Sequence, residues 1–405
     1  MENKINKICV VGLGYIGLPT SALLANRGFQ VHGVDVNQHA VDTINQGKIH
    51  IVEPELDTFV KAAVESGKLK AFTVPSEADV FVLAVPTPFH DDGGEIPRPN
   101  IDYVLAATRA VAPYVRAGNI VILESTSPVG TTDAIERVLK EEGVDTDQIY
   151  IAHCPERVLP GKIMKELIEN DRVVGGVTPA ATRIVAAFYR TFVQGEVLET
   201  DARTAEMAKL TENSCRDVQI AFANELSLIC DKMGIDVWEL IRLANRHPRI
   251  NILQPGVGVG GHCIAVDPWF IVDSDPENAR LIRRAREVNL RKTEWVIQRI
   301  KEEAAGLGKQ KPVVALMGLA FKPDIDDLRE SPAVHVAKAL KAEKSMELLF
   351  VEPNIQTHPA FDLIPVDSAC QKADLIVFLV KHKEFSTLKN LPAPVLDFCG
   401  VFASK

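Results

Sequence analysis

Long apolar runs are missing from this sequence of 405 residues. No stretch approaches the roughly 18 consecutive apolar residues that indicate a membrane-spanning helix, so we expect none. The N-terminal segment combines a charged start with an apolar stretch, as a signal peptide does. Glycines interrupt that stretch, however, and no small-residue cleavage site follows it. We therefore expect a cytoplasmic protein with no membrane partner.

Paired cysteines are also missing. The chain has seven cysteines, and none belongs to a Cys-x-x-Cys pair. They are Cys9, Cys154, Cys215, Cys230, Cys263, Cys370 and Cys399. This odd and scattered set favours neither a zinc site nor a disulfide scaffold, so we expect reduced thiols and no bound metal.

Basic residues are outnumbered. The sequence has 45 Lys and Arg against 54 Asp and Glu, which gives a net charge of −9. An acidic chain is a poor general partner for nucleic acid, so individual basic residues must hold any phosphate. The hydrophobic fraction of 46% is ordinary for a globular protein. The length predicts two or three domains.

Residues 1–195 alternate short apolar runs with helical segments such as residues 102–115. Buried strands of a parallel sheet have this character, so the segment predicts a doubly wound α/β domain. The predicted strands are residues 7–11, 30–34, 80–85, 119–124, 149–153 and 172–177.

Residues 196–305 have a helical pattern instead. Long helices are predicted at residues 204–233 and 277–305, with a Gly/Pro-rich loop at 254–268 between them. We expect a central helical domain that carries a dimer surface. Strand–helix alternation returns in residues 306–405, with strands at 313–317, 348–351, 375–380 and 395–397. The predicted fold is thus α/β, with two Rossmann-like doubly wound parallel-sheet domains joined by a long-helix central region.

A Gly-x-Gly-x-x-Gly pattern follows the first predicted strand and opens a helix. Gly12 allows a tight turn, Gly14 lets the backbone approach a pyrophosphate, and Gly17 lets the helix pack closely on the strand. Asp35 ends the next strand, where a carboxylate can bond the ribose hydroxyls of NAD and repel the 2′-phosphate of NADP. A glycine turn with a chance Asp is the alternative. The segment 318–322 has no second such pattern, so we expect the last domain to bind a different nucleotide.

Four glycines precede Cys263 within residues 256–263. Such a backbone can close around a ligand, and a thiol on such a loop is placed for nucleophilic chemistry. A structural cysteine in a glycine turn explains the pattern equally well, because cysteine is more often buried than catalytic.

Polar residues that could serve this thiol lie on one helix face. Lys209, Asn213 and Arg216 have the spacing i, i+4 and i+7. A solvated charged face is the alternative. Four further cations could hold a diphosphate, although most surface Lys and Arg are simply solvated. These are His247, Arg249, Lys322 and Arg329.

Taken together, these motifs resemble those of the UDP-glucose/GDP-mannose dehydrogenase family, in order and through nearly the whole chain. The matching segments are GLGYIGLP at 12–19, ILESTSPVGTT at 122–132, CPERVLPG at 154–161, TAEMAKLTEN at 204–213, GVGGHC at 258–263 and GLAFKPDIDDLRESP at 318–332. The resemblance favours a catalytic Cys263.

Within the family, the segments around residues 242–256 and 260–272 resemble the branch that acts on UDP-N-acetylhexosamines. Val266-Asp267 stands where UDP-glucose enzymes usually have Lys-Asp, and His262 and Trp269 fit the same branch. The resemblance implies UDP-N-acetyl-D-mannosamine as substrate, with UDP-N-acetyl-glucosamine or UDP-glucose as alternatives.

The implied reaction oxidises the C6 alcohol to a carboxylate and consumes two NAD. Lys209, or a water held by Asp267, takes the first proton, and Cys263 forms a thiohemiacetal and then a thioester. Glu156 and Thr126 position the hydrolytic water, while Lys209 and Asn213 stabilise the oxyanion. The rival reaction classes are a two-electron hydroxyacid dehydrogenase and a non-catalytic NAD sensor.

The remaining roles also come from the resemblance. The implied substrate contacts are Arg157, Val158, Lys209, Asn213, Arg216, His247, Arg249, Gly260 and Lys322. The implied cofactor contacts are Gly12, Gly14, Tyr15, Ile16, Gly17, Asp35, Thr87, Thr126 and Arg329. A homodimer and a role in precursors of surface polysaccharide or enterobacterial common antigen are further implications.

Overall fold

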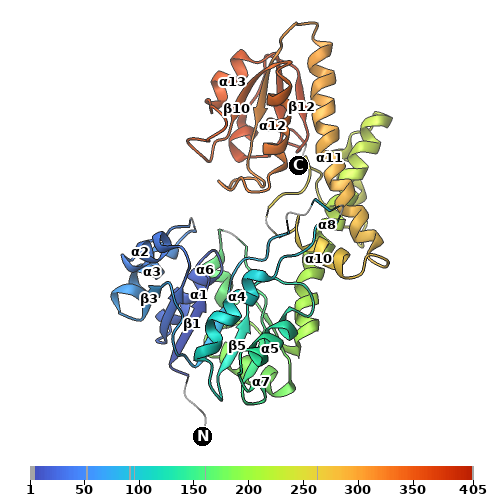
Figure 1. Ribbon diagram of the computed structural model, residues 1–405. Coiled ribbons are helices and arrows are strands. Elements are labelled where there is room, and N and C mark those ends of the chain that lie inside the picture. The colour runs from blue at the N-terminus through green and yellow to red at the C-terminus, as the bar shows by residue number, and fades with distance from the viewer. Residues whose placement is uncertain are drawn as a thin grey trace. The chain divides into compact units, whose positions relative to one another are not determined.

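The computed structural model describes residues 5–403 except residues 52, 91, 92, 95, 160 and 262. The chain forms two compact units, Met1–Thr211 and Glu212–Lys405 (Figure 1). Among the described residues, no helix is long and apolar enough to cross a membrane.

The first unit is built on an eight-stranded sheet in the order β3-β2-β1-β4-β5-β6-β7-β8. Its strands are β1 (Lys7–Val11), β2 (Gln30–Val34), β3 (Leu69–Phe72), β4 (Val80–Leu83), β5 (Ile120–Leu123), β6 (Tyr150–His153), β7 (Arg172–Gly176) and β8 (Val197–Asp201). Its helices are α1 (Gly17–Asn26), α2 (Gln38–Asn45), α3 (Leu56–Glu65), α4 (Asp102–Val111), α5 (Thr131–Glu141), α6 (Ile163–Glu169) and α7 (Pro179–Tyr189).

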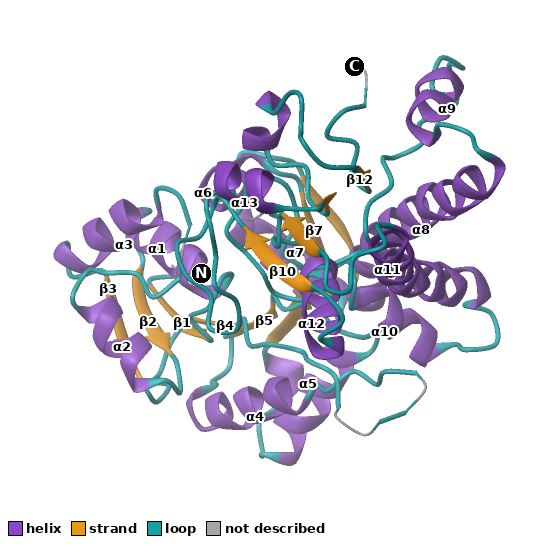
Figure 2. Cartoon of the chain, turned by 90° about the horizontal axis from the view of Figure 1, so that it is seen from above, coloured by secondary structure: helices purple, strands orange, loops and turns teal. Residues whose placement is uncertain are grey.

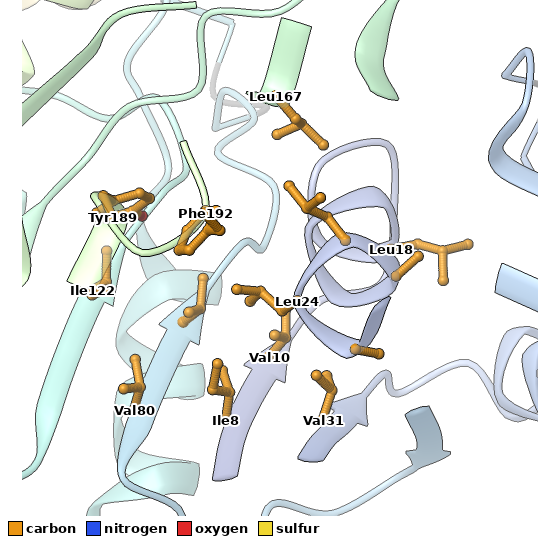
Figure 3. Close-up of a cluster of buried hydrophobic side chains, with 14 of the residues drawn as sticks. Ile8, Val10, Leu18, Leu24, Val31, Val80, Ile122, Leu167, Tyr189 and Phe192 are labelled. Atoms are coloured by element: carbon orange, nitrogen blue, oxygen red, sulfur yellow. The ribbon is translucent and has the colours of Figure 1, made fainter. Parts of the chain in front are cut away.

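Both faces of this sheet are buried. Along β1, Ile8 and Val10 belong to one apolar cluster, and Cys9 and Val11 belong to another. The alternation arises because successive side chains of a strand point to opposite faces. Figure 3 shows side chains of the first cluster between the strands and α1, while α4 and α5 pack side by side (Figure 2). The predicted α/β class is confirmed.

Four details of the first unit differ from the prediction. The pair β6–β7 is antiparallel, unlike the other neighbouring strands. The apolar pattern misses β3, which exposes Lys70, and β8, in which only Val197 is buried. Because β8 pairs with β7, the sheet reaches Asp201, beyond the predicted boundary at residue 195. The helix predicted at 102–115 ends at Val111, before a 3-10 turn that contains Pro113, which has no N–H to donate.

The second unit combines long helices with a four-stranded parallel sheet in the order β10-β9-β11-β12. Its strands are β9 (Val313–Met317), β10 (Glu347–Val351), β11 (Leu375–Phe378) and β12 (Val395–Asp397). Its helices are α9 (Val237–Ala244), α10 (Asp267–Ser274), α11 (Arg280–Gly306), α12 (Pro332–Glu343) and α13 (Val366–Lys372), and α8 (Ala202–Met233) runs from the first unit into the second. The long helices predicted from the sequence correspond to α8 and α11.

The turns that follow β1 and β9 have the same geometry. Gly12 and Gly318 have φ angles of 90° and 92°, in the region that favours glycine. Their N–H groups donate to the carbonyls of Val34 and Val351, in both cases at 2.8 Å. A Cβ on Gly318 would lie 2.6 Å from the Cβ of Val380. The two sheets therefore share a local design at the edge where their strands end.

Replacing Gly318 by Ala tests this constraint. We expect the second unit to lose roughly 1–3 kcal/mol of unfolding free energy, because the added methyl group meets Val380 and the φ angle is unfavourable. The matched control is Gly306→Ala at the end of α11, where an added Cβ has no neighbour within 4 Å. The control should be neutral or stabilising by up to ~1 kcal/mol. Urea-unfolding curves measure both, and equal stabilities would contradict this account.

Candidate active site

The glycine turn of the first unit has the shape that a pyrophosphate needs. A Cβ on Gly17 would lie 1.8 Å from the carbonyl oxygen of Gly12, so α1 can approach the turn only without a side chain there. A Cβ on Gly14 would meet no atom within 4 Å, so this face of the turn is open. No side chain caps the start of α1 at Ile16, and its first turn contains no acidic residue. These features fit an anion at a helix N-terminus.

Asp35 follows β2 and is hydrogen bonded to the glycine turn. Its Oδ2 accepts the N–H of Leu13 at 2.9 Å, and its Oδ1 accepts the N–H of Asn37 at 2.9 Å. The carboxylate is therefore fixed beside the turn and remains half-exposed. A carboxylate at this position can accept hydrogen bonds from the ribose hydroxyls of a dinucleotide.

The loops that follow β4 and β5 are tied to each other at the same edge of the sheet. The Thr87 hydroxyl donates to the Thr126 carbonyl at 2.6 Å, and the Ser125 hydroxyl donates to the Val85 carbonyl at 2.6 Å. Thr87 and Thr126 are both half-buried. Ligands of open α/β sheets bind at this carboxyl edge, so both residues lie where a cofactor contact is expected.

Glu156 follows β6 and is almost fully buried. Its Oε2 pairs with Nη1 of Arg172 at 2.6 Å, and its Oε1 accepts the N–H of Arg157 at 2.7 Å. The Arg157 guanidinium donates to the carbonyl of Asp171, and Val158 packs beside the first apolar cluster. Sequence reasoning missed Arg172. The only signal for it is an arginine at the first position of a buried strand.

In the second unit, the predicted catalytic residues Asn213, Cys263 and Asp267 come together. Nδ2 of Asn213 donates to Oδ2 of Asp267 at 2.5 Å. The N–H groups of Asp267 and Val266 donate to the carbonyl of Cys263 at 2.8 and 3.1 Å, and Asp267 begins α10. Lys209 is half-buried one turn before Asn213 on α8, on the first-unit side of the boundary.

The exposure of Cys263 is relevant to the alternative that this residue is only a structural cysteine in a glycine turn. Cys263 and Cys215 are exposed, whereas Cys9, Cys154, Cys230 and Cys370 are buried. A thiol on an exposed loop is available to a substrate, whereas a buried structural cysteine is inert. The neighbouring His262 lies outside the described residues.

Three of the four glycines before Cys263, namely Gly258, Gly260 and Gly261, are packed against their own unit. A Cβ on Gly258 would lie 2.4 Å from the hydroxyl of Thr293, and a Cβ on Gly260 would lie 2.5 Å from the carbonyl of Glu330 and 2.6 Å from Pro332. Close packing therefore requires glycine here. The closure around a ligand stays a prediction.

A buried polar ladder holds the start of this loop. Oδ1 of Asn224 accepts the N–H of Gly256 at 2.9 Å, and Nδ2 of Asn224 donates to Asn289 at 2.9 Å. Asn289 donates in turn to Asp217 at 2.8 Å, and Arg286 pairs with Asp217 at 2.7 Å. Burial raises the pKa of Asp217, and the Arg286 guanidinium opposes that rise. The sequence analysis did not identify this ladder.

The other predicted cations lie on exposed parts of the second unit. Arg216 projects from α8, and His247 and Arg249 follow α9. Lys322 lies in the loop between β9 and α12, as does Arg329, whose guanidinium is paired with Asp327 at 2.6 Å. Their contacts to a diphosphate stay predictions.

Replacing Asp35 by Ala tests the cofactor assignment. We expect kcat/KM for NAD relative to NADP to fall by roughly 10- to 100-fold, because a charged hydrogen-bond acceptor and the repulsion of a 2′-phosphate are both removed. The matched control is Asp79→Ala. Oδ2 of Asp79 also accepts backbone N–H groups, those of Asn6 and Lys7, but at the amino end of β1. The control should keep the preference. Equal use of both nucleotides by the unmodified protein would contradict the assignment.

Comparison with known proteins identifies the family. The models of the UDP-glucose/GDP-mannose dehydrogenase family match residues 6–193 (NAD binding domain), 203–291 (central domain) and 315–403 (UDP binding domain). A UDP-N-acetyl-D-mannosamine dehydrogenase of Campylobacter jejuni is 54% identical, over 98% of this chain and 100% of that protein. An NDP-N-acetyl-D-galactosaminuronic acid dehydrogenase of Ralstonia nicotianae is 53% identical, over 98% and 96%.

Among solved structures, the UDP-D-ManNAc dehydrogenase of Pyrococcus horikoshii matches with a TM-score of 0.90 and 36% identity, over 98% of this chain and 96% of that one. The resemblance inferred from the motifs is confirmed. We conclude that the chain belongs to the UDP-glucose/GDP-mannose dehydrogenase family, whose NAD-binding, central and UDP-binding domains follow one another along it.

Proposed function

We propose that this chain oxidises UDP-N-acetyl-D-mannosamine to UDP-N-acetyl-D-mannosaminuronate and uses two NAD per sugar. The observation that carries the proposal is the exposed Cys263, whose carbonyl accepts the N–H of Asp267, while the Asp267 carboxylate accepts the amide of Asn213. A two-electron dehydrogenase needs no thiol in its site. The name of the Campylobacter relative supports the choice of sugar.

The oxidation begins at the C6 hydroxyl. Lys209, or a water held by Asp267, takes its proton, and an ammonium group would also stabilise the developing alkoxide. Bound at the glycine turn, NAD would supply the hydride acceptor for each of the two oxidations. The residues proposed to hold it are Gly12, Gly14, Tyr15, Ile16, Gly17, Asp35, Thr87, Thr126 and Arg329.

Cys263 connects the two oxidations. Its thiolate adds to the C6 aldehyde to give a thiohemiacetal, which remains on the enzyme and is oxidised to a thioester. Water then cleaves the thioester, regenerates the thiol and leaves the carboxylate. Glu156 and Thr126 position this water, and the amine of Lys209 and the amide of Asn213 stabilise the oxyanion.

We propose the domain bounds 1–195, 196–305 and 306–405, and we assign nine residues to contact with the UDP-sugar. These residues are Arg157, Val158, Lys209, Asn213, Arg216, His247, Arg249, Gly260 and Lys322. We place the enzyme in the cytoplasm, where its product would serve as a precursor of surface polysaccharide such as enterobacterial common antigen.

A homodimer through the central helices is part of the proposal. On α8, Phe222, Ile229 and Met233 are 53%, 47% and 65% exposed, and on α11 Leu281 and Leu290 are 68% and 53% exposed. Such a group of exposed large apolar side chains is typical of an interaction surface. Light scattering of the intact chain and of Phe222→Glu tests it, with the variant expected to shift toward monomer.

A second sugar is favoured by one comparison, because the Ralstonia relative named for N-acetyl-D-galactosaminuronic acid is 53% identical. A panel of the UDP derivatives of N-acetyl-mannosamine, N-acetyl-galactosamine, N-acetyl-glucosamine and glucose separates these substrates. Nicotinamide absorbance should show two NADH per sugar and the highest kcat/KM with N-acetyl-mannosamine. One NADH per sugar would indicate a two-electron dehydrogenase instead.

Replacing Cys263 tests the covalent mechanism. Cys263→Ser keeps the size of the side chain, but a hydroxyl is far less acidic than a thiol, so turnover should fall by at least about 100-fold while NAD and UDP-sugar still bind. Cys263→Ala removes the covalent route altogether. Mass spectrometry of protein quenched during turnover should find a sugar adduct on residue 263 in the Ser variant and none in the Ala variant.

The matched control is Cys215→Ala, which removes the exposed cysteine of α8. Its activity should stay near that of the unmodified protein. If Cys263→Ala still produced two NADH per sugar at a near-normal rate, Cys263 would be structural and the proposed mechanism would be wrong.

A further inference from the structure

A cluster of buried charges lies behind the Glu156 carboxylate. Its members are Glu124, Glu156 and Arg172, which are 2%, 6% and 2% exposed. They come from the ends of β5 and β6 and from the first position of β7. Two carboxylates and one guanidinium are thus buried in the interior of the first unit, where Arg172 pairs with Glu156 and acts electrostatically on Glu124.

Arg172 is held in one orientation by three neighbours. Its Nη1 donates to Oε2 of Glu156 at 2.6 Å, and its Nη2 donates to the carbonyl of Leu167 at 3.1 Å. The guanidinium carbon lies 5.6 Å from the centroid of the Tyr189 ring. Because Oε1 of Glu156 also accepts the N–H of Arg157, both oxygens of this carboxylate are fixed.

Glu124 is the second carboxylate of the cluster. Tyr189 of α7 donates its hydroxyl to Oε1 at 2.7 Å, and Thr20 of α1 donates to Oε2 at 3.3 Å. Figure 3 shows Tyr189 over the end of β5, near Ile122. Burial and the nearby Glu156 raise the pKa of Glu124 to about 7, against the opposing effect of Arg172. Near neutral pH, Glu124 therefore exists in both protonation states.

The other titratable groups that face the cluster are uncharged at neutral pH. Burial raises the pKa of Cys154 to about 12 and raises the pKa of Tyr189 well above its ordinary value. Ionisation of Glu124 is therefore the change that alters the charge balance around Arg172 near pH 7.

We propose that Arg172 is a positioning residue that fixes Glu156 for cleavage of the thioester. Glu124 in its protonated form carries no charge, so it does not compete with Glu156 for the Arg172 guanidinium. The inference rests on the proposed function. A buried carboxylate without a cationic partner is strongly disfavoured, so the guanidinium both stabilises and orients Glu156 in its buried position. When Glu124 ionises, two anions compete for one cation and the hold on Glu156 weakens.

Arg172→Lys is the first test, because lysine keeps the charge but lacks the planar fork of arginine. With UDP-N-acetyl-D-mannosamine and NAD, we expect a rapid first release of two NADH per active site, followed by steady-state turnover reduced roughly 10- to 100-fold. Quenched samples should contain the sugar acyl group on Cys263. The matched control is Arg190→Lys, which changes an exposed pair with Glu199 at 2.8 Å in the same unit and should leave both phases unchanged.

Glu124→Gln is the second test, because it keeps the size of the side chain and cannot ionise. In the unmodified protein, the rate of thioester cleavage should fall as the pH rises through about 7. In the variant, this fall should be absent, while KM for the sugar stays close to its original value. This measurement remains decisive if Arg172→Lys does not fold.

The outcomes separate this inference from the proposed function. If the unmodified protein reduced NAD with none of the UDP-sugars, the proposed function would be wrong. If the unmodified protein were active but Arg172→Lys lost the first NADH release together with steady-state turnover, Arg172 would serve stability alone. An unchanged pH profile in Glu124→Gln would exclude the role given to Glu124.

Discussion

The close meeting of strand ends at the carboxyl edge of each sheet is the constraint on which the candidate site depends. A Cβ on Gly12 would lie 2.6 Å from the carbonyl oxygen of Ala84, which follows β4, and the Gly12 N–H is bonded to the end of β2. Three chain segments therefore converge where the first strand ends, and none of them can move away without breaking a ladder of parallel hydrogen bonds. The residues that come next, Asp35, Thr87 and Thr126, gather at this edge as a consequence. The core of the sheet determines where the loops that carry these residues begin, and the short length of the loops determines where the residues lie.

Strand ends also converge in the second sheet, but there the N–H groups of the turn are bonded to a buried carboxylate. Oε2 of Glu352, at the end of β10, accepts the N–H groups of both Leu319 and Ala320, whereas Asp35 accepts only the N–H of Leu13 from its turn. Burial raises the pKa of Glu352, but hydrogen bonds from His382 and the backbone outweigh burial and lower it to about 2. The Glu352 carboxylate thus occupies these two backbone donors of the second turn.

The sequence was informative where the decisive residues are neighbours along the chain. The glycine turn and Asp35 lie within one strand–helix–strand unit, and fully buried strands such as β4 and β5 are continuous apolar runs. The edge strands β3 and β8 carry polar residues on exposed positions, so no such run marks them. Arg172 pairs with Glu156 from another strand, and Asn289 meets Asp217 across 72 positions of sequence. Such pairs are determined by tertiary packing. The family resemblance identified Glu156 as a site residue but did not identify its partner, Arg172.

The polar ladder of the second unit follows from burying a loop. Inside a protein, a backbone N–H or carbonyl must find a partner, and the segment before Cys263 forms no regular structure that would supply one. Asn224 satisfies the N–H of Gly256, and the Thr293 hydroxyl satisfies the carbonyl of Val257 at 2.8 Å. The amide of Asn224 then needs an acceptor of its own, which Asn289 provides, and the amide of Asn289 needs Asp217. The ladder ends on the Asp217 carboxylate, which pairs with Arg286. One buried loop thereby requires polar residues on two helices, and these residues keep the segment that leads to Cys263 in a single arrangement.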